Sequence, residues 1–217
     1  MFELTKADHI AIDHNDHGYL NNKGAEYYSK GKYDLAVEYY RLAAAMGDDQ
    51  AISNLGYCYL YGRQIEADLS LALAYLKIAC DKGNVDAAYK LGDIYGSDKW
   101  GIKDRELSVY YYRVAAVFMF GDDFSLERIQ NDENILRYPS LCFALGREHG
   151  LDGQLPTELE LSYVYLETAR KGYDRELMNG NRMYEQAYNG VLEYLNRPEY
   201  QPIREKYETR DEDLLLS

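Results

Sequence analysis

The residues with the clearest capacity for chemistry are three histidines and three aspartates near the start of the 217-residue chain, in the stretch DHIAIDHNDH. Imidazole nitrogens and carboxylate oxygens bind divalent metals, and His9, His14 and His17 could serve a metal-dependent hydrolase. An isolated polar cluster of this kind is more typical of a segment that covers the first helix of a domain. We therefore predict an N-terminal cap at residues 1–16 without a metal site, and keep the hydrolase as an alternative.

A second stretch, GYCYLYG from Gly56 to Gly62, places two glycines six residues apart. A phosphate-binding loop would need Lys and then Ser or Thr after the second glycine, and Arg63 and Gln64 stand there instead. The three cysteines are too scattered for a metal site or a disulfide framework, so we expect small, buried, apolar side chains. No serine-nucleophile or zinc-protease motif is present. We predict a non-catalytic protein without a cofactor.

Composition narrows the choice of partner. The net charge of −13 argues against nucleic-acid phosphates and anionic membranes and favours a basic protein or peptide. The chain has 24 tyrosines against five phenylalanines, and tyrosine gives a binding surface a large contact area with a polar tip. No apolar stretch is long enough to span a membrane. The first residues show no basic and apolar leader, so we expect a cytoplasmic location.

The elements that carry these residues repeat along the chain. Four stretches align without gaps: LAVEYYRLA from Leu35, LALAYLKIA from Leu71, LSVYYYRVA from Leu107 and LSYVYLETA from Leu161. Within each, the small residue after the Leu, the bulky residue four later and the Ala three beyond fall on one face of a helix. The recurring tyrosines, which we expect to pack between repeats, are Tyr39, Tyr75, Tyr111 and Tyr165. The last step is longer than the others and predicts an insertion at about 122–138, which either carries a specific contact or packs through Leu126, Ile129 and Leu136.

A Leu-Gly pair recurs upstream of each of the last three stretches, with Gly56, Gly92 and Gly146 in step with them. A glycine inside a helix costs about 1 kcal/mol relative to alanine, so its recurrence predicts close contact with a neighbouring helix. Asp68 and Asp104 fit the N-termini of the second helices. The pattern predicts four helical hairpins, at 17–47, 49–83, 85–121 and 139–172, whose second helices end at Gly47, Gly83, Gly121 and Gly172.

These hairpins predict an all-α fold, a right-handed α-α superhelix or solenoid in which each hairpin covers the apolar face of the next. The repeat array would span 17–172. A capping helix is expected at 174–195, and Pro198 and Pro202 are expected to end regular structure. The tail at 196–217 is charged and then apolar, and it either docks as a helix or stays loose.

The chain resembles the Sel-one-like repeat proteins, relatives of the tetratricopeptide family. Two units, from Ala51 to Gly83 and from Ala87 to Gly121, match the pattern A-x-x-x-L-G-x-x-Y followed by the second-helix pattern with Tyr and Ala-Ala. The resemblance implies scaffold or adaptor work, with a partner held on a concave face of first helices. Some secreted members join successive repeats by a disulfide. Here Cys80 faces Ala88 at the partner position, which favours a reducing compartment.

If the first helices follow tetratricopeptide geometry, the groove would be lined by the residue two before the Leu, the residue after the Gly, and the one or two residues after the Tyr. This predicts a partner-binding set of Asn21, Tyr28, Ser53, Tyr57, Leu60, Tyr61, Tyr89, Asp93, Phe143 and Arg147. Tyrosines there would anchor a partner, and the polar members would orient its backbone or charge.

Three hypotheses of function follow. The first is a non-catalytic adaptor that binds a protein segment on its tyrosine-rich face. The second is an immunity or inhibitor protein that neutralises a basic toxin or nuclease by charge complementarity. The third is the metal-dependent hydrolase, which requires the histidine cluster to come together.

Overall fold

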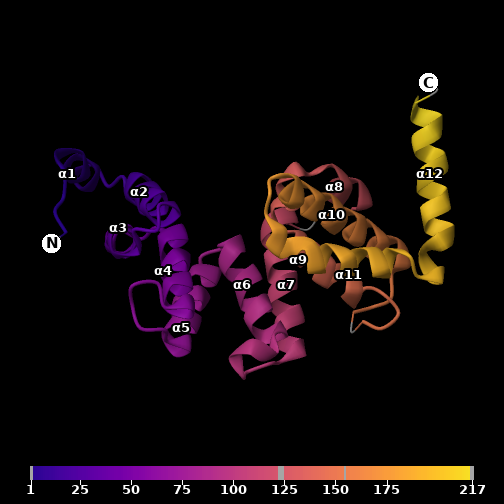
Figure 1. Cartoon of the computed structure of the whole chain (residues 1–217), viewed down its shortest axis with the longest axis horizontal. Coiled ribbons are helices and arrows are strands. Elements are labelled where there is room, and N and C mark those ends of the chain that lie inside the picture. Colours follow the sequence, from indigo (N-terminus) through magenta and orange to yellow (C-terminus); the bar gives the residue numbers. More distant parts are fainter. Residues whose placement is uncertain (1, 122–124, 154, 216–217) are drawn as a thin grey trace. The chain divides into compact units, whose positions relative to one another are not determined.

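The computed structural model describes residues 2–121, 125–153 and 155–215 (Figure 1). These residues form α-helices joined by short 3-10 helices and turns, and none of them lies in a β-strand. The predicted fold class, an all-α solenoid of helical hairpins, is confirmed. The helices belong to two compact units, residues 1–118 and 119–217, which we call unit 1 and unit 2.

Unit 1 consists of a short opening helix followed by three helical hairpins. Each hairpin has a first helix (α2, α4 or α6) and a second helix (α3, α5 or α7), and the first helices begin where the sequence predicts the hairpins to begin. The elements in order are α1 (Lys6–Asp13), α2 (His17–Ser29), α3 (Tyr33–Ala45), α4 (Asp49–Tyr61), α5 (Leu69–Asp81), α6 (Val85–Gly96), the 3-10 helix η1 (Asp98–Trp100) and α7 (Arg105–Phe120), whose last two residues fall in unit 2.

Side-chain caps fix the starts of the four helices in the second and third hairpins, α4, α5, α6 and α7. The capping side chains each accept a hydrogen bond from the backbone N–H three residues later, at 2.7–3.0 Å, and are Asp48, Asp68, Asn84 and Asp104. A cap of this kind stabilises a helix by about 1 kcal/mol. Past the ends of α3 and α5, Gly47 and Gly83 take φ values of +94° and +89°, which side chains other than glycine rarely adopt. The predicted roles of Asp68, Asp104, Gly47 and Gly83 are confirmed.

The recurring glycine is where the two helices of a hairpin touch. A Cβ atom at Gly56 would lie 2.8 Å from Cγ of Leu76, and one at Gly92 would lie 2.6 Å from Cδ1 of Tyr112. Gly24 meets the ring of Tyr40 in the same way, so the first hairpin shares the arrangement. The predicted close contact between helices is confirmed.

Three residues after each of these glycines, an aromatic ring stacks on the recurring tyrosine of the second helix. The Tyr59 and Tyr75 rings are 5.4 Å apart with an interplanar angle of 9°, and Tyr95 and Tyr111 are 5.8 Å apart with an angle of 5°. The first hairpin has the same stack between Tyr27 and Tyr39. These stacks join the two helices of one hairpin, whereas the sequence predicted packing between repeats.

Helix α1 is attached to unit 1 through a buried carboxylate. The Asp8 side chain is fully buried, and it accepts hydrogen bonds from Lys23 Nζ at 2.6 Å and from the Tyr39 hydroxyl at 2.9 Å. It also caps its own helix, because the Thr5 backbone N–H donates to Asp8 Oδ2 at 2.7 Å. Burial raises the pKa of Asp8, but the hydrogen bonds from Lys23, Thr5 and Tyr39 outweigh it, so the pKa falls well below its usual range.

Unit 2 contains the fourth hairpin with elements before and after it. In order these are α8 (Leu126–Asn131), η2 (Glu133–Arg137), α9 (Pro139–Glu148), α10 (Leu159–Met178), η3 (Arg182–Tyr184), α11 (Glu185–Leu195), η4 (Pro198–Tyr200) and α12 (Gln201–Leu215). The hairpin is formed by α9 and α10, where a Cβ atom at Gly146 would lie 2.8 Å from Cγ of Leu166. His149 takes the place of the first-helix tyrosine and stacks on Tyr165 at 6.2 Å.

The prediction that Gly172 ends the second helix of this hairpin is wrong, because α10 continues through it to Met178. Gly172 instead allows the insertion to approach α10: a Cβ atom there would lie 2.9 Å from the backbone oxygen of Leu136. Within the insertion, residues 122–124 lie outside the described residues, and α8 and η2 follow them. Ile129 and Ile135 are buried, so the described part of the insertion packs as an extra layer on α10.

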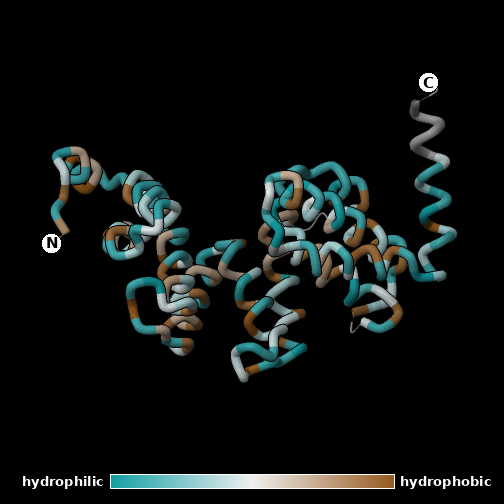
Figure 2. Tube along the Cα trace, viewed as in Figure 1, coloured by the Kyte–Doolittle hydropathy of each residue, from teal (hydrophilic) through white to brown (hydrophobic). Residues whose placement is uncertain are grey.

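Further along, the capping helix is shorter than predicted, because its first residues belong to α10 and η3 and only α11 remains. Neither proline ends regular structure: Pro198 opens η4 and Pro202 lies in the first turn of α12. Proline is tolerated there because the first helical N–H groups have no intrahelical partner. The described turns of α12 are mostly hydrophilic (Figure 2).

Candidate functional site

The histidine cluster is dispersed in the structure. His14 contacts the backbone oxygen of Ile10 at 2.8 Å, His17 pairs with Asp48 at 2.7 Å, and His9 is exposed. Among residues 2–121, 125–153 and 155–215, no group of three His, Cys, Asp or Glu side chains is arranged to hold a metal ion. The His17–Asp48 contact instead links the starts of α2 and α4.

The three cysteines, Cys58, Cys80 and Cys142, are free and buried, as the sequence predicts. Burial raises the pKa of the Cys58 and Cys80 thiols to about 11. A thiol of this kind is a poor nucleophile at neutral pH, because only the thiolate reacts. None of the helices, within the part of the chain that the structure describes, is long and apolar enough to cross a membrane.

The predicted partner-binding residues of unit 1 divide into an accessible and a buried group. Ser53 and Leu60 are 0% and 3% exposed, so both are removed from the candidate surface. Asn21 is also buried, and its Oδ1 accepts a hydrogen bond from Asn54 Nδ2 at 3.0 Å. The remaining members, which are half-buried or exposed, are Tyr28, Tyr57, Tyr61, Tyr89 and Asp93.

Helical spacing explains this division. Gln50, Asn54, Tyr57 and Tyr61 are separated by four, three and four residues, so they share one face of α4. Ser53 lies one position off this face. We call the surface formed by these four residues, by Tyr28 of α2, and by Asp86, Tyr89, Lys90 and Asp93 of α6 the groove face.

Lys90 joins α4 and α6 on the groove face. Its Nζ lies 2.9 Å from Asp93 Oδ2, 5.2 Å from the centre of the Tyr57 ring and 5.5 Å from that of Tyr89. Burial lowers the pKa of Lys90, but Asp93 and the tyrosines outweigh it, so the pKa is raised and the ammonium stays charged. The Tyr112 hydroxyl also donates to Asp93, at 2.8 Å. Lys90 therefore holds Asp93 and both rings in fixed positions.

The groove face contains a hollow of about 280 Å³. Residues from four helices line it, and they are Tyr28 (α2), Tyr40 (α3), Gln50, Asn54 and Tyr57 (α4), and Asp86 (α6). Sequence reasoning missed four of the six. The register could have found three of these, since Gln50 and Asp86 both lie six residues before the recurring glycine and Asn54 lies two before it. Tyr40 could not be found in this way, because it comes from a second helix.

At the end of α4, Tyr61 extends the aromatic surface onto η1. The Tyr61 and Trp100 rings meet edge to face at 5.9 Å, and Lys99 Nζ lies 4.4 Å from the centre of the Trp100 ring. Tyr61 is 40% exposed, whereas the other tyrosines of the groove face are half-buried. Large aromatic residues of this kind are frequent anchors in protein interfaces.

The two predicted residues of unit 2, Phe143 and Arg147, both lie on α9. The Arg147 guanidinium lies 5.0 Å from the centre of the Phe143 ring, and the same ring meets Tyr194 of α11 edge to face at 5.7 Å. Arg147 is exposed, whereas Phe143 is half-buried against α11. Phe143 therefore has a packing role within unit 2.

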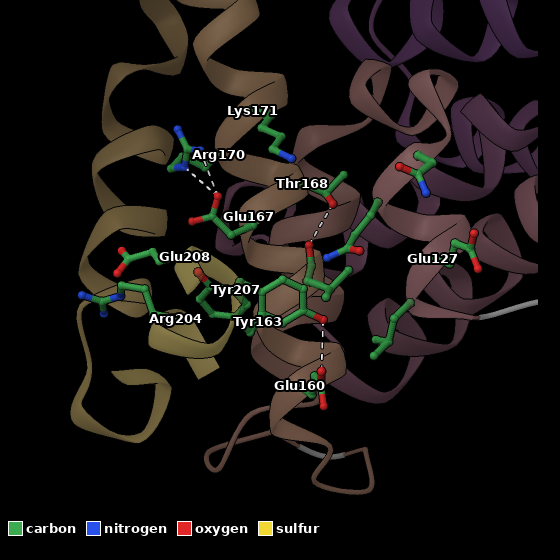
Figure 3. A pocket seen from close by; sticks show the side chains of 14 residues that line it. Glu127, Glu160, Tyr163, Glu167, Thr168, Arg170, Lys171, Arg204, Tyr207 and Glu208 are labelled. Atoms are coloured by element: carbon green, nitrogen blue, oxygen red, sulfur yellow. Dashed lines mark hydrogen bonds and ion pairs between the residues drawn. The ribbon is translucent and has the colours of Figure 1, made fainter. Parts of the chain in front are cut away.

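Unit 2 has a larger hollow, of about 760 Å³, among α8, α10 and α12 (Figure 3). Tyr163 of α10 and Tyr207 of α12 lie next to each other in it, with ring centres 5.5 Å apart. The Tyr207 hydroxyl donates to Glu160 at 3.1 Å, and Lys206 pairs with the same carboxylate at 2.6 Å. These contacts hold the first turns of α12 against α10 through Lys206 and Tyr207.

The sequence also matches known repeat families. The Sel1 repeat model matches residues 49–84, 85–116 and 139–173, and a tetratricopeptide repeat model matches residues 17–49. The chain therefore carries three Sel1 repeats preceded by a tetratricopeptide repeat. The resemblance to the Sel-one-like repeat proteins is confirmed.

The solved structures similar to the chain include two repeat proteins. A Sel1 repeat protein from Oxalobacter formigenes has a TM-score of 0.54 at 20% identity, over 73% of this chain and 59% of that one. A protective antigen of uropathogenic Escherichia coli strains that displays an SLR fold has a TM-score of 0.45 at 15% identity, over 87% of this chain and 51% of that one. The chain thus spans less than two thirds of either structure, and the first likeness shows the fold alone. No curated protein matches the sequence.

Proposed function

We propose that this protein is a non-catalytic interaction scaffold that binds a segment of another protein on the groove face of unit 1. Sel1 and tetratricopeptide repeats are generally protein-interaction modules, which supports a protein partner. The observation that carries the proposal is the hollow where α2, α3, α4 and α6 meet, lined by three tyrosines, two amides and a carboxylate. Aromatic rings next to polar groups that can form hydrogen bonds with a partner are typical of the centre of a protein interface.

The net charge of −13 favours a basic partner, because charge complementarity raises the association rate and selects among partners. It also supports a second role on the same face, that of an immunity or inhibitor protein that neutralises a basic toxin or nuclease. A toxin gene beside this one, or recovery of a single basic protein with toxic activity, would favour the second role over a general adaptor. The three free thiols support the expected cytoplasmic location.

Affinity capture from the native cell extract tests the proposal. The bait would be the full chain, compared with a groove variant that carries Tyr57→Ala, Tyr61→Ala and Tyr89→Ala. A control variant would carry Leu71→Ala, Ile78→Ala and Tyr110→Ala, which remove exposed apolar side chains from the second helices.

We expect the groove variant to lose the partner and the control variant to retain it, with equal helical content by circular dichroism. Capture that survives in the groove variant would contradict the proposal. The next surface to test would then be the hollow beside the insertion helix α8.

A further inference from the structure

The hollow on the groove face is lined by a hydroxyl group on a side chain whose ring is fixed by packing. Tyr40 is 3% exposed, and its ring is fixed because it fills the space above Gly24, within 2.7 Å of where a Cβ atom would lie. The Tyr40 hydroxyl makes no hydrogen bond to another described residue, although Tyr40 lines the hollow. Because the ring is held in place, its hydroxyl is positioned in the hollow to accept a hydrogen bond from a ligand.

Three further groups that line the hollow can accept hydrogen bonds. Asp86 has no hydrogen-bond or ion-pair partner among the described residues, and neither does the hydroxyl of Tyr57. Asn54 uses its Nδ2 to reach Asn21, so its Oδ1 remains available. Together with Tyr40, these side chains form a site for a donor-rich group.

The charges around the hollow favour a cation. Asp86 is the one charged side chain among the six residues that line it. Two cations lie nearby: Lys90 pairs with Asp93 at 2.9 Å, and Arg63, whose pKa is raised by the Tyr28 hydroxyl, has its guanidinium 5.0 Å from the centre of the Tyr33 ring. Asp86 is therefore the carboxylate still available to a ligand.

We infer that this hollow binds the side chain of an arginine in the partner segment, held between the Tyr28 and Tyr57 rings with its guanidinium on Asp86. The inference rests on the proposed function and names the chemistry that the partner supplies. A guanidinium is planar, stacks on aromatic rings and has five N–H donors, which matches a set of acceptors better than the three donors of lysine. An aliphatic side chain would leave Asp86 and Tyr40 unpaired. The volume of about 280 Å³ is below the usual size of small-molecule sites and suits one long side chain.

The test uses capped tripeptides as defined probes in place of the natural partner. The ¹⁵N-labelled full chain would be titrated with Ac-Gly-Arg-Gly-NH₂ and followed by backbone amide chemical shifts. Matched peptides would carry citrulline, which keeps the shape of arginine but not its charge, or leucine. We expect weak, saturable binding of the arginine peptide, with shifts at residues 54, 57 and 86, and binding of the other two at least about tenfold weaker. Equal binding of the citrulline or leucine peptide would overturn the inference.

Variants locate the site. Asp86→Asn is expected to weaken binding of the arginine peptide about tenfold because it removes the negative charge, and Tyr40→Phe several-fold because it removes an acceptor. The matched controls are Asp81→Asn, the same charge change at an exposed position of α5, and Tyr110→Phe on an exposed tyrosine of α7. Both controls should bind as the wild type does. Wild-type binding by Asp86→Asn would also overturn the inference.

The capture experiment separates this inference from the proposed function. If the groove variant loses the native partner while Asp86→Asn and Tyr40→Phe retain it, the groove function stands and the arginine site is overturned. If the arginine peptide binds and depends on Asp86 while the groove variant still captures the partner, the site stands and the proposed function fails.

Discussion

Gly56 and Leu76 are so close that no side chain fits between them: a Cβ atom on Gly56 would lie 2.8 Å from Cγ of Leu76. The backbone oxygen of Ala72 would be 3.3 Å away on the same helix, so the space is closed by backbone as well as side chain. Because the same relationship recurs in each hairpin, the glycine determines how closely the first helix approaches the second. The groove-face residues on α4 are placed by this contact.

We predict that Gly56→Ala destabilises unit 1 by about 1–3 kcal/mol, the usual cost of overpacking a filled core. Gly18→Ala is the matched control, because a Cβ atom there meets nothing closer than Asp16 Oδ1 at 3.7 Å. Gly18 also lies in a helix, so alanine there is expected to be neutral or to stabilise by up to about 1 kcal/mol. Urea unfolding followed by circular dichroism measures both. Equal effects of the two substitutions would show that the close contact is unimportant.

The buried Asp8–Lys23 pair predicts that the attachment of α1 depends on both partners. Asp8→Asn leaves the Lys23 ammonium without its carboxylate and is expected to cost about 3 kcal/mol at pH 7. Asp13→Asn removes an exposed carboxylate from the same helix and should change little. Urea unfolding would measure both, and a similar, small cost for the two variants would contradict a role for the pair.

The same pair predicts a pH dependence. The folded-state pKa of Asp8 is lowered, so its contribution is complete above the unfolded-state pKa of about 3.9 and is lost as the pH falls through the folded-state pKa. The folded-state pKa of Lys23 is raised, so its contribution is complete below about 10.4 and is lost as the pH rises above that value. The difference in stability between wild type and Asp8→Asn should therefore be smaller at pH 3 than at pH 7. A difference that does not change with pH would contradict this assignment.

Thiol reactivity tests the burial of the cysteines. Because burial raises the pKa of Cys58 and Cys80 to about 11, very little thiolate exists at pH 7.5 in the folded protein. We expect Ellman's reagent to react slowly with all three thiols of the native chain and quickly after denaturation. One thiol that reacts rapidly in the native protein would show that its helix opens or that its surroundings differ from those described.

The docking of α12 depends on Tyr163, which is 6% exposed and lies 5.5 Å from Tyr207 and 6.3 Å from Tyr200, centre to centre. Tyr163→Ala should release α12, because the ion pair between Lys206 and Glu160 is exposed and contributes at most about 1 kcal/mol. Hydrogen exchange would then show faster exchange at residues 201–209. Tyr110→Ala, at a position 58% exposed, is the control. Unchanged protection in Tyr163→Ala would mean that other contacts hold the helix.

The fold could be predicted because the residues that form the contacts between helices recur at fixed spacing along the sequence. Gly56 and Leu76 are both repeat positions, so their close contact follows from spacing alone. The end of α10 could not be predicted in this way. Gly172 lies one residue earlier in the repeat than Gly83, which follows the end of α5, and it has a different physical role, since the insertion approaches it through the backbone oxygen of Leu136. That contact depends on tertiary packing, which the local sequence does not encode.

The candidate site was predicted less well, for a geometric reason. The sequence indicated a tyrosine-rich face, but Ser53 was placed on it when Asn54 lies there, an error of one residue. In a helix, one residue is a rotation of about 100°, enough to move a side chain from the surface to the interior. Tyr40 comes from another helix and required the structure.

Photo-cross-linking tests the central claim, that a partner binds on the groove face, most directly. The photo-reactive residue p-benzoylphenylalanine would replace Tyr61 on the groove face in one sample and Ile78 on the outer side of α5 in the other, positions that are 40% and 49% exposed. After irradiation in the native extract, we predict a partner adduct from position 61 and none from position 78. An adduct of the same partner from position 78 and none from position 61 would contradict the account.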